Sequence, residues 1–418
     1  MRIKTDITAL GELLIDFTEN GKSEQGNGLY EANPGGAPCN VLSLLAKMGK
    51  ETGFIGKVGS DQFGTLLKNT LLDVNISTEG LVVDNQVRTT LAFVHTFPDG
   101  DREFSFYRNP GADMMLTEEE VKADMIEQAK IFHFGTLSMT HEGVRKATHR
   151  AVDIAKKAGI LISFDPNLRP PLWSSRELAK EQIEWGLAQC DILKISDNEI
   201  QFVSGKDDYD DGIAYLQEKY QIPLILLTMG KDGSRAYYKG KRIEKAGFAV
   251  KAIETTGAGD TFCGCSLNYI LEHDFTNLSD EELEEMLTFA NAGAALVTLK
   301  KGAIYSMPEK EEIASFAAHQ ATMVIFLSTG MAEKLSKRLI AGGYSENTPA
   351  AIVYKATWED EKAVICTVGT LAKAAEENNI TKTALMIIGD AVTHSHYERS
   401  ELYNPAFTTE FRQATKER

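Results

Sequence analysis

The regular alternation of short apolar runs with helical periodicity limits the folds open to this chain. From residue 131, an apolar run (131–135) precedes a helical pattern (141–158), and a second apolar run (159–164) ends at Asp165. Strands that are joined through helices lie parallel, because each crossover returns the chain to the same edge of the sheet. The sequence therefore predicts an α/β fold whose functional side chains follow the carboxyl ends of strands.

The segment from Gly257 to Asp260 has the composition of an anion-binding turn. An apolar approach at 247–253 leads into Gly257, Ala258 and Gly259, and a helical pattern follows Asp260. Because these small residues leave the main-chain amides uncovered, the amides and the positive end of the helix could together hold a phosphate. Asp260 would then accept the proton of an attacking hydroxyl, as in a small-molecule kinase. An ordinary strand-to-helix turn, with an Asp favoured by the helix dipole, would have the same residues.

Polar residues near the amino terminus form a second candidate site. The apolar run 7–15 ends at Asp16, and Gly35 and Gly36 precede Asn40 at the start of a helical pattern. Open α/β sheets bind ligands beyond their strand ends, and paired glycines admit a ligand close to the backbone. We expect Asp16, the two glycines and Asn40 to bind the substrate, although Asn40 could simply cap its helix.

Both segments resemble the signatures of the ribokinase-like (PfkB) carbohydrate kinases, and the resemblance extends over about residues 5–316. It implies a kinase domain at 1–317 with a ribokinase-like three-layer α/β/α core and a small β-sheet lid (approximately 12–35 and 86–110). In the family, an Asp, a Gly-Gly pair and an Asn of this kind hold the sugar, and ATP and Mg²⁺ are used. The chain departs from the family pattern at Glu254, where an Asp is usual.

A motif that follows a strand end indicates which sugar is bound. Residues 165–173 read D-P-N-x-R-x-x-L-W, which looks like the bacterial fructokinases of the family. Asn167 and Arg169 lie just beyond a predicted strand, where Asn167 could contact the substrate. Arg169 could hold the transferring phosphoryl group or a sugar hydroxyl. The resemblance therefore favours a hexose over ribose.

The sequence at 89–108 predicts a hairpin that could cover the site. Apolar and polar residues alternate on both sides of the turn sequence P-D-G-D. In the family a small sheet closes over the sugar, so Arg102, Phe104 and Arg108 are candidates to contact it. Exposed hairpin arginines are often only solvated, which is the alternative. A homodimer formed through this lid is also expected.

The resemblance also assigns residues to ATP and to metal ions. The segment 196–199 is similar to the family's N-x-x-E, whose Glu positions Mg²⁺ through its water shell; Ser196 replaces the Asn and Glu199 is retained. The residues expected near the nucleotide are Lys194, Thr228, Gly230, Gly233 and Asn291. The residues expected near a monovalent cation such as K⁺ are Glu254, Thr256, Gly302 and Ser306. A plain hairpin turn at 230–233 and small-residue packing around Asn291 are the alternatives.

The composition restricts the partners and the compartment. A net charge of −16 would repel nucleic acid and an anionic membrane. The apolar runs are too short to span a bilayer, and the amino terminus has no signal-peptide core. The five cysteines form neither a zinc spacing nor a disulfide framework. We therefore expect a cytoplasmic protein whose partners are a small-molecule sugar and its cofactors.

A second, smaller α/β pattern follows the kinase pattern at 318–392. Segments 349–357 and 385–392 resemble the carboxyl-terminal half of tetrapyrrole methyltransferases, notably cobalt-precorrin-4 methyltransferase. That family binds S-adenosylmethionine between two halves, and this sequence lacks the glycine-rich amino-terminal half. A half-cleft would bind weakly, so we expect a methyltransferase remnant or fusion without independent activity. Residues 393–418 are predicted to form a polar, frayed tail.

Taken together, these patterns predict an ATP-dependent kinase that converts D-fructose to fructose 6-phosphate, with Asp260 as the base and the amides of 257–260 as the anion hole. Kinases of ribose, a riboside or 2-keto-3-deoxygluconate would differ mainly in lid and strand-end side chains. A sugar-binding protein without turnover and a methyltransferase are alternatives of other classes. The retained Asp260 argues against the first, and the missing half argues against the second.

Overall fold

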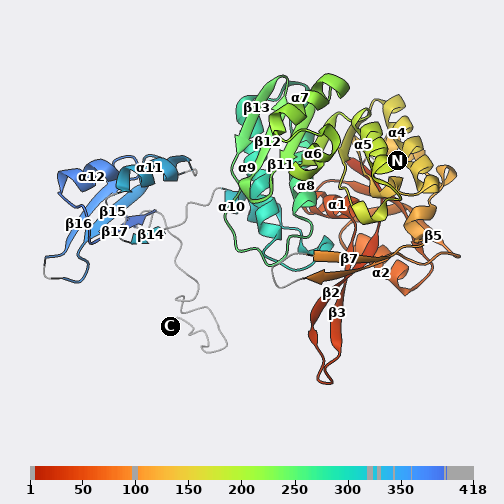
Figure 1. The fold of residues 1–418 in the computed structure, drawn as a ribbon, viewed down its shortest axis with the longest axis horizontal. Coiled ribbons are helices and arrows are strands. Elements are labelled where there is room, and N and C mark those ends of the chain that lie inside the picture. Colours follow the sequence, from red (N-terminus) through yellow and green to blue (C-terminus); the bar gives the residue numbers. More distant parts are fainter. Residues whose placement is uncertain are drawn as a thin grey trace, which may run out of the picture. The chain divides into compact units, whose positions relative to one another are not determined.

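The computed structural model describes residues 5–96, 102–317, 323–326, 331–341, 344–358, 360–389 and 392 (Figure 1). The chain divides into two compact units, Met1–Ala317 and Ala318–Arg418, which we call the N-terminal and C-terminal units. Within the described ranges, no helix is both long and apolar enough to cross a membrane. All five cysteines are free thiols.

A nine-stranded sheet runs through the N-terminal unit in the order β13-β12-β11-β10-β9-β8-β1-β4-β5. Neighbouring strands from β5 to β11 are parallel, whereas β12 and β13 pair antiparallel at one edge. The strands are β1 (Ile7–Leu10), β4 (Thr52–Gly59), β5 (Ile76–Asp84), β8 (Ile131–Gly135), β9 (Leu161–Asp165), β10 (Ile192–Ser196), β11 (Leu224–Thr228), β12 (Ser234–Tyr238) and β13 (Lys241–Lys245). Because the parallel strands point the same way, their carboxyl ends meet at one edge of the sheet.

Helices cover both faces of this sheet, and each face has its own apolar core. The strands alternate between the two cores: Leu224 and Leu226 belong to one, Ile225 and Leu227 to the other. The helices on the first face are α1 (Ala37–Lys47), α2 (Gln62–Asp73), α8 (Ala258–Glu272), α9 (Asp280–Val297) and α10 (Lys310–Ala317). The helices on the second are α3 (Ala123–Glu127), α4 (Glu142–Ala158), α5 (Arg176–Leu187), α6 (Asp197–Ser204) and α7 (Tyr209–Tyr220).

A separate four-stranded sheet, in the order β3-β2-β6-β7, projects from the N-terminal unit. Its strands are β2 (Leu14–Lys22), β3 (Gly28–Gly35), β6 (Leu91–Thr96) and β7 (Arg102–Tyr107). They lie within 12–35 and 86–110, the stretches for which the sequence predicts a lid, and β6 pairs with β7 as an antiparallel hairpin. The tip of that hairpin, 97–101, lies outside the described residues. Figure 1 shows the β2–β3 hairpin extending away from the helices of this unit.

The C-terminal unit has its own sheet, in the order β14-β17-β15-β16. The strands are β14 (Met323–Phe326), β15 (Pro349–Tyr354), β16 (Lys362–Thr367) and β17 (Ala384–Ile388), and the helices are α11 (Ala332–Ala341) and α12 (Leu371–Glu377). Ile352, Leu371 and Met386 are fully buried in a core that belongs to this unit alone. The α/β fold with a large ribokinase-like sheet and a second small sheet domain is thereby confirmed. The tail predicted at 393–418 lies outside the described residues.

The contact between α2 and β4 gives a test of this packing. A Cβ atom added at Gly64 would lie 1.9 Å from the carbonyl oxygen of Gly59, so the first turn of α2 would have to move. Gly64→Ala should therefore lower the free energy of unfolding by about 1–3 kcal/mol. Lys68→Ala, on the exposed side of the same helix, should change it by about 0.5 kcal/mol or less. Urea unfolding followed by circular dichroism measures both, and equal stabilities would contradict the predicted clash.

Candidate functional site

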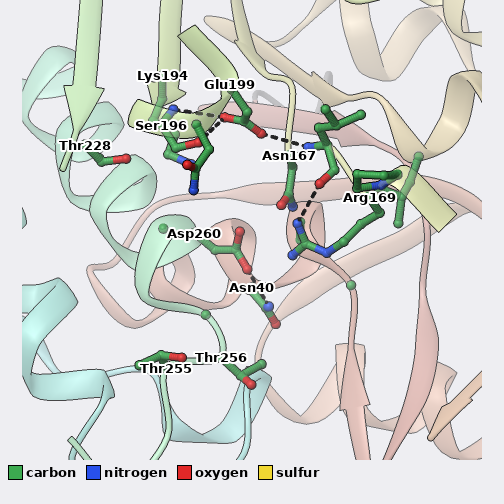
Figure 2. Close-up of a pocket in the computed structure, with 18 of the residues that line it drawn as sticks. Asn40, Asn167, Arg169, Lys194, Ser196, Glu199, Thr228, Thr255, Thr256 and Asp260 are labelled. Atoms are coloured by element: carbon green, nitrogen blue, oxygen red, sulfur yellow. Dashed lines mark hydrogen bonds between the residues drawn. The ribbon is translucent and has the colours of Figure 1, made fainter. Parts of the chain in front are cut away.

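A cavity of about 930 Å³ lies at the carboxyl edge of the parallel strands. Its wall comes from the loops after β1, β9, β10 and β11, from the start of α8, and from β2 and β7 of the small sheet. The predicted site residues that border it are Asp16, Gly36, Asn40, Asn167, Arg169, Lys194, Glu199, Thr228, Gly230, Thr256, Gly257, Gly259 and Asp260. Residues from both ends of the kinase pattern therefore meet in one cavity (Figure 2).

The start of α8 supplies main-chain amides to this cavity. Gly257 adopts a positive φ of 78°, which glycine tolerates, and the helix begins at Ala258. The first amides of a helix have no acceptor within the helix, and the positive end of the helix dipole lies beside them. Gly257, Gly259 and Asp260 border the cavity, whereas the Ala258 amide donates to the Thr255 carbonyl at 3.3 Å. The sequence analysis had included Ala258 in the anion hole, but its amide is directed to Thr255 instead.

Asp260 is fixed by Asn40 from the opposite helix. Asn40 Nδ2 donates a hydrogen bond of 2.7 Å to Asp260 Oδ2, and Figure 2 shows the two side chains pointing toward one another. Burial raises the pKa of Asp260, while the Asn40 hydrogen bond and the charges of Lys194 and Arg169 favour the carboxylate. A buried carboxylate with a raised pKa beside uncovered amides is suited to accept a proton.

Lys194 and Asp165 form a buried ion pair beneath the start of α8. Lys194 Nζ lies 3.0 Å from Asp165 Oδ2, and both side chains are less than a tenth exposed. Burial raises the pKa of Asp165 to about 7, against the effect of Lys194. Burial lowers the pKa of Lys194, but Asp165, Glu199 and Asp260 outweigh it, so the net shift is upward and the ammonium is retained. A Cβ at Gly259 would lie only 3.1 Å from Lys194 Nζ, so the glycine lets this cation lie against the helix.

The amino-terminal candidates lie on the other side of Asp260. A Cβ at Gly35 would lie 2.5 Å from Asp16 Oδ2, so the glycine makes room for this carboxylate. Gly35 itself is not one of the described residues that border the cavity. Burial raises the pKa of Asp16 to about 7; Arg169 opposes the shift, and Glu254 and Asp260 add to it. Gly36 has a φ of 133°, and its main chain approaches the Glu12 carbonyl oxygen closely. These residues form a polar pocket beside Asp260.

Arg108 does not face the cavity. Its guanidinium forms a buried ion pair with Asp113 at 2.6 Å and donates to Thr140 Oγ1 at 2.8 Å and to the Leu137 carbonyl at 3.0 Å. The predicted sugar contact is therefore replaced by a structural role at the base of the small sheet. Arg102 and Phe104 lie in β7, but their side chains are outside the described part of the chain.

Glu199 is held by the protein through both carboxylate oxygens. Oε1 accepts from the Leu168 amide at 2.7 Å, and Oε2 accepts from the amide and hydroxyl of Ser196 at 2.9 and 2.8 Å. Ser196, which replaces the Asn of the family motif, therefore keeps a bond to the Glu. Oε2 already accepts two hydrogen bonds, whereas Oε1 accepts one and keeps a second lone pair, so this arrangement suits contact with a metal ion through water better than direct ligation.

The four residues predicted for a monovalent cation gather in the turn before α8 and the loop after α9. Glu254 Oε1 accepts from Thr256 Oγ1 at 2.7 Å, and Oε2 accepts from the Gly302 amide at 3.2 Å. Ser306 Oγ donates to the Lys301 carbonyl, and a Cβ at Gly302 would lie 2.8 Å from Ser306 Oγ. Oxygen atoms therefore cluster beside Thr256, which borders the cavity.

The residues predicted at the nucleotide divide into two groups. Thr228 and Gly230 border the cavity together with Lys194. The Asn291 side chain accepts from Ser234 Oγ at 2.9 Å and donates to the carbonyls of Lys245 and Ala246 at 3.2 and 3.3 Å. Gly233, with a φ of 105°, starts the β12–β13 hairpin. Neither Asn291 nor Gly233 borders the cavity: Asn291 connects α9 to β12 and to the end of β13 through hydrogen bonds, and Gly233 belongs to the turn before β12.

Several residues that border the cavity were not predicted as site residues, among them Glu12, Phe106, Arg176, Phe202 and Thr255. Phe106 lies in β7, within the alternating apolar and polar pattern from which the hairpin was predicted, so that pattern could have indicated it. The Arg176 guanidinium lies 4.8 Å from the centre of the Phe202 ring. No local pattern predicts that contact, because it depends on how α5 packs against α6.

The chain is similar to plant and bacterial fructokinases. It is 44% identical over 310 residues to fructokinase-2 of Solanum lycopersicum, a match that covers 73% of this chain and 94% of that protein. The structure of a fructokinase from Xylella fastidiosa with bound ATP has a TM-score of 0.68 and 29% identity, covering 75% of this chain and 98% of that one. A double mutant of the Vibrio cholerae O395 fructokinase, with fructose, ADP and potassium ion bound, has a TM-score of 0.68 and 28% identity, covering 76% and 100%.

Two family models match the chain. The one for tetrapyrrole (corrin/porphyrin) methylases matches residues 287–372, in keeping with the resemblance of the C-terminal pattern. The one for the pfkB family of carbohydrate kinases matches residues 4–310, which is nearly the whole N-terminal unit. The cavity, its uncovered amides and its buried carboxylate all lie within that match, and the chain belongs to the pfkB family of carbohydrate kinases.

Proposed function

We propose that the chain transfers the γ-phosphoryl group of ATP to the 6-hydroxyl of D-fructose, giving fructose 6-phosphate and ADP. The observation that carries this proposal is the position of Asp260, which lies between the amides at the start of α8 and the polar pocket around Asp16 and Asn40. The fructokinases of Solanum lycopersicum and Xylella fastidiosa support the choice of sugar and of ATP.

In this proposal each part of the cavity has one task. Asp16, Gly36, Asn40 and Asn167 bind the sugar, and Asp260 accepts the proton of its 6-hydroxyl as the oxygen attacks phosphorus. The bond between the γ-phosphorus and the bridging oxygen of ADP breaks at the same time. The amides of Gly257, Gly259 and Asp260, with Lys194 and Arg169, stabilise the negative charge on the transferring group.

Two metal sites are part of the proposal. Glu199, whose Oε1 atom keeps a lone pair available to water, would hold hydrated Mg²⁺ beside the phosphates and so offset their charge. Glu254, Thr256, Gly302 and Ser306 would hold K⁺ beside the turn that precedes α8. The potassium ion in the Vibrio cholerae fructokinase structure supports the second site. The free thiols support a reducing compartment such as the cytoplasm.

A coupled assay with ATP, Mg²⁺ and Asp260→Ala tests the role of the base. The variant should lose about 10²–10⁴-fold in kcat, because a positioned general base contributes that much. Thr276→Ala is the surface control. Thr276 is exposed and does not border the cavity, so this variant should retain the kcat of the unaltered chain.

The pH profile provides a second readout of the same base. Burial raises the pKa of Asp260 above the ordinary Asp value of 3.8. As the pH is lowered, kcat/KM for fructose should therefore begin to fall at a higher pH than it would with an Asp of ordinary pKa. Full activity of Asp260→Ala would disprove the assignment. A panel of fructose, ribose, a riboside and 2-keto-3-deoxygluconate in the same assay decides the sugar.

We also propose that the C-terminal unit is a methyltransferase remnant without activity of its own. Two observations support this proposal. About three quarters of this chain is enough to match almost the whole length of a solved fructokinase, and each of the two units has its own core. The family model for methylases reaches only residue 372 and begins inside α9 of the N-terminal unit. Kinase activity therefore needs no residue beyond 317.

Ending the chain after Ala317 tests this division. The shortened protein should phosphorylate fructose with kcat and KM within about twofold of the full chain, because no side chain that borders the cavity is removed. Isothermal calorimetry of the full chain with S-adenosylmethionine should show no saturable binding. Binding of S-adenosylmethionine, or loss of kinase activity on shortening, would show that the C-terminal unit has a function.

We propose, finally, that the chain forms a homodimer through the small sheet. One face of this sheet carries Phe17 and Phe93, stacked with ring centres 4.9 Å apart, and Tyr30 and Tyr107 flank Phe93 with 52% and 67% of their surfaces exposed. Clustered exposed aromatic rings are typical of protein interfaces.

Light scattering on a sizing column measures the assembly. The unaltered chain should have the mass of two chains, and Tyr30→Asp with Tyr107→Asp should have the mass of one, because a charge in a buried apolar interface is costly. Leu72→Asp, at an equally exposed apolar position on α2, is the control and should remain dimeric. A monomeric unaltered chain would rule out the dimer.

A further inference from the structure

Glu12 is a buried carboxylate to which the proposed reaction assigns no task. It lies in the loop between β1 and β2, borders the cavity, and is only 3% exposed. Its Oε1 atom accepts a hydrogen bond of 2.9 Å from the amide of Ala37, the first residue of α1. This bond satisfies one of the amides that a helix leaves without an acceptor at its start.

The main chain of Glu12 lies close to the same turn. A Cβ atom added at Gly36 would lie 2.4 Å from the Glu12 carbonyl oxygen, so the approach of the two segments requires glycine at this position. Gly36 also has a φ of 133°, which side-chain-bearing residues rarely adopt. The Glu12 side chain therefore bonds to a turn that packs closely against the Glu12 main chain, just after the end of β1.

This turn leads directly to the proposed base. The Asn40 amide donates to the Gly36 carbonyl at 2.9 Å, which makes Asn40 part of the first turn of α1. Asn40 Nδ2 in turn donates to Asp260 Oδ2 at 2.7 Å. A continuous set of hydrogen bonds therefore runs from Glu12 through the start of α1 to the side chain that accepts the proton.

We propose that Glu12 is a positioning residue: its hydrogen bond to the Ala37 amide sets the start of α1, and thereby the orientation of Asn40 and Asp260. The inference rests on the proposed kinase function. It does not require Glu12 to touch the sugar or ATP. The role requires a side chain long enough to bring an acceptor oxygen to the Ala37 amide, and it does not require a negative charge.

The surroundings of Glu12 agree with a role that does not depend on charge. Burial raises the pKa of this carboxyl to about 7; the amides it accepts from and Arg108 oppose the shift, and Asp113 adds to it. His133 and Asp165 line the small recess behind Glu12, and the Cys39 thiol, whose pKa is raised by burial, is close enough for the charge of Glu12 to raise that pKa further. Either form of the carboxyl retains an oxygen that can accept from Ala37.

Two conservative variants separate reach from charge. Glu12→Gln keeps the length and an acceptor oxygen but loses the charge, whereas Glu12→Asp keeps the charge but is one methylene too short. The inference expects Glu12→Gln to retain kcat within about fivefold and Glu12→Asp to lose about 10- to 100-fold, because small misplacements of a reacting group are costly. KM for ATP should change little in either variant. An active Asp variant with an inactive Gln variant would overturn the inference.

A double variant tests whether Glu12 acts through Asn40. If it does, Glu12→Asp combined with Asn40→Ala should lose no more kcat than Asn40→Ala alone, since the connection is already broken. Losses that multiply would show that Glu12 acts independently and would overturn the inference. Asp208→Ala, which removes the acceptor at the start of α7, is the control for loss of a helix cap and should leave kcat unchanged.

Failure of the inference is distinguishable from failure of the proposed function. If the unaltered chain phosphorylates no sugar of the panel, the proposed function is wrong. If the unaltered chain is active and Glu12→Asp has the same kcat, only the positioning role is wrong. Thermal unfolding of each variant, measured beside the assay, identifies any loss of activity that comes from unfolding.

Discussion

The hydrogen bond between Asn40 and Asp260 connects the two helices on which the site depends. The residues are 220 positions apart, yet their side chains meet at 2.7 Å in the interior of the N-terminal unit. Asn40 is fixed by the first turn of α1 and Asp260 by the first turn of α8. In a buried setting such a bond has few competing partners, so the proposed sugar pocket and the proposed phosphate site at the start of α8 have one defined geometry. The remaining polar groups of the site are arranged around this contact.

Acidic side chains outnumber the basic ones around this bond. Burial raises the pKa of Asp16, Asp165 and Asp260. The positive charges of Lys194 and Arg169 oppose these shifts, and at Asp260 the Asn40 hydrogen bond opposes the shift as well. A site with this excess of acids would be unfavourable for ATP without additional positive charge. The uncovered amides at the start of α8 supply part of that charge, and the proposed Mg²⁺ would supply the rest. The pairing of Lys194 with Asp165 also keeps this cation from neutralising the base directly.

The sequence was sufficient for features that depend on local patterns. The βα alternation from residue 131, the hairpin at 89–108 and the turn at Asp260 follow from periodicity, turn residues and short motifs, whereas the rest of the small sheet was expected only from the family resemblance. The sequence was insufficient where a side chain could bond either to a ligand or to protein groups that are distant in the sequence. Arg108 faces Asp113 instead of the cavity, and Asn291 bonds to Ser234 and to β13, because buried donors take the nearest acceptors that the tertiary packing provides. Glu12 was also missed, because its hydrogen-bond partner Ala37 is 25 residues away in the sequence.

The departure from the family pattern at Glu254 is accommodated locally. The longer side chain still bonds to Thr256 within the turn, and its second oxygen reaches the Gly302 amide in the loop after α9. Its main-chain amide also donates to the Thr298 carbonyl at 3.1 Å, so the residue is held at both ends. Gly302 has a φ of 100° and leaves room beside Ser306 for this contact. The protein itself therefore fixes the turn before α8, and a cation bound there would reinforce a conformation that these hydrogen bonds already select.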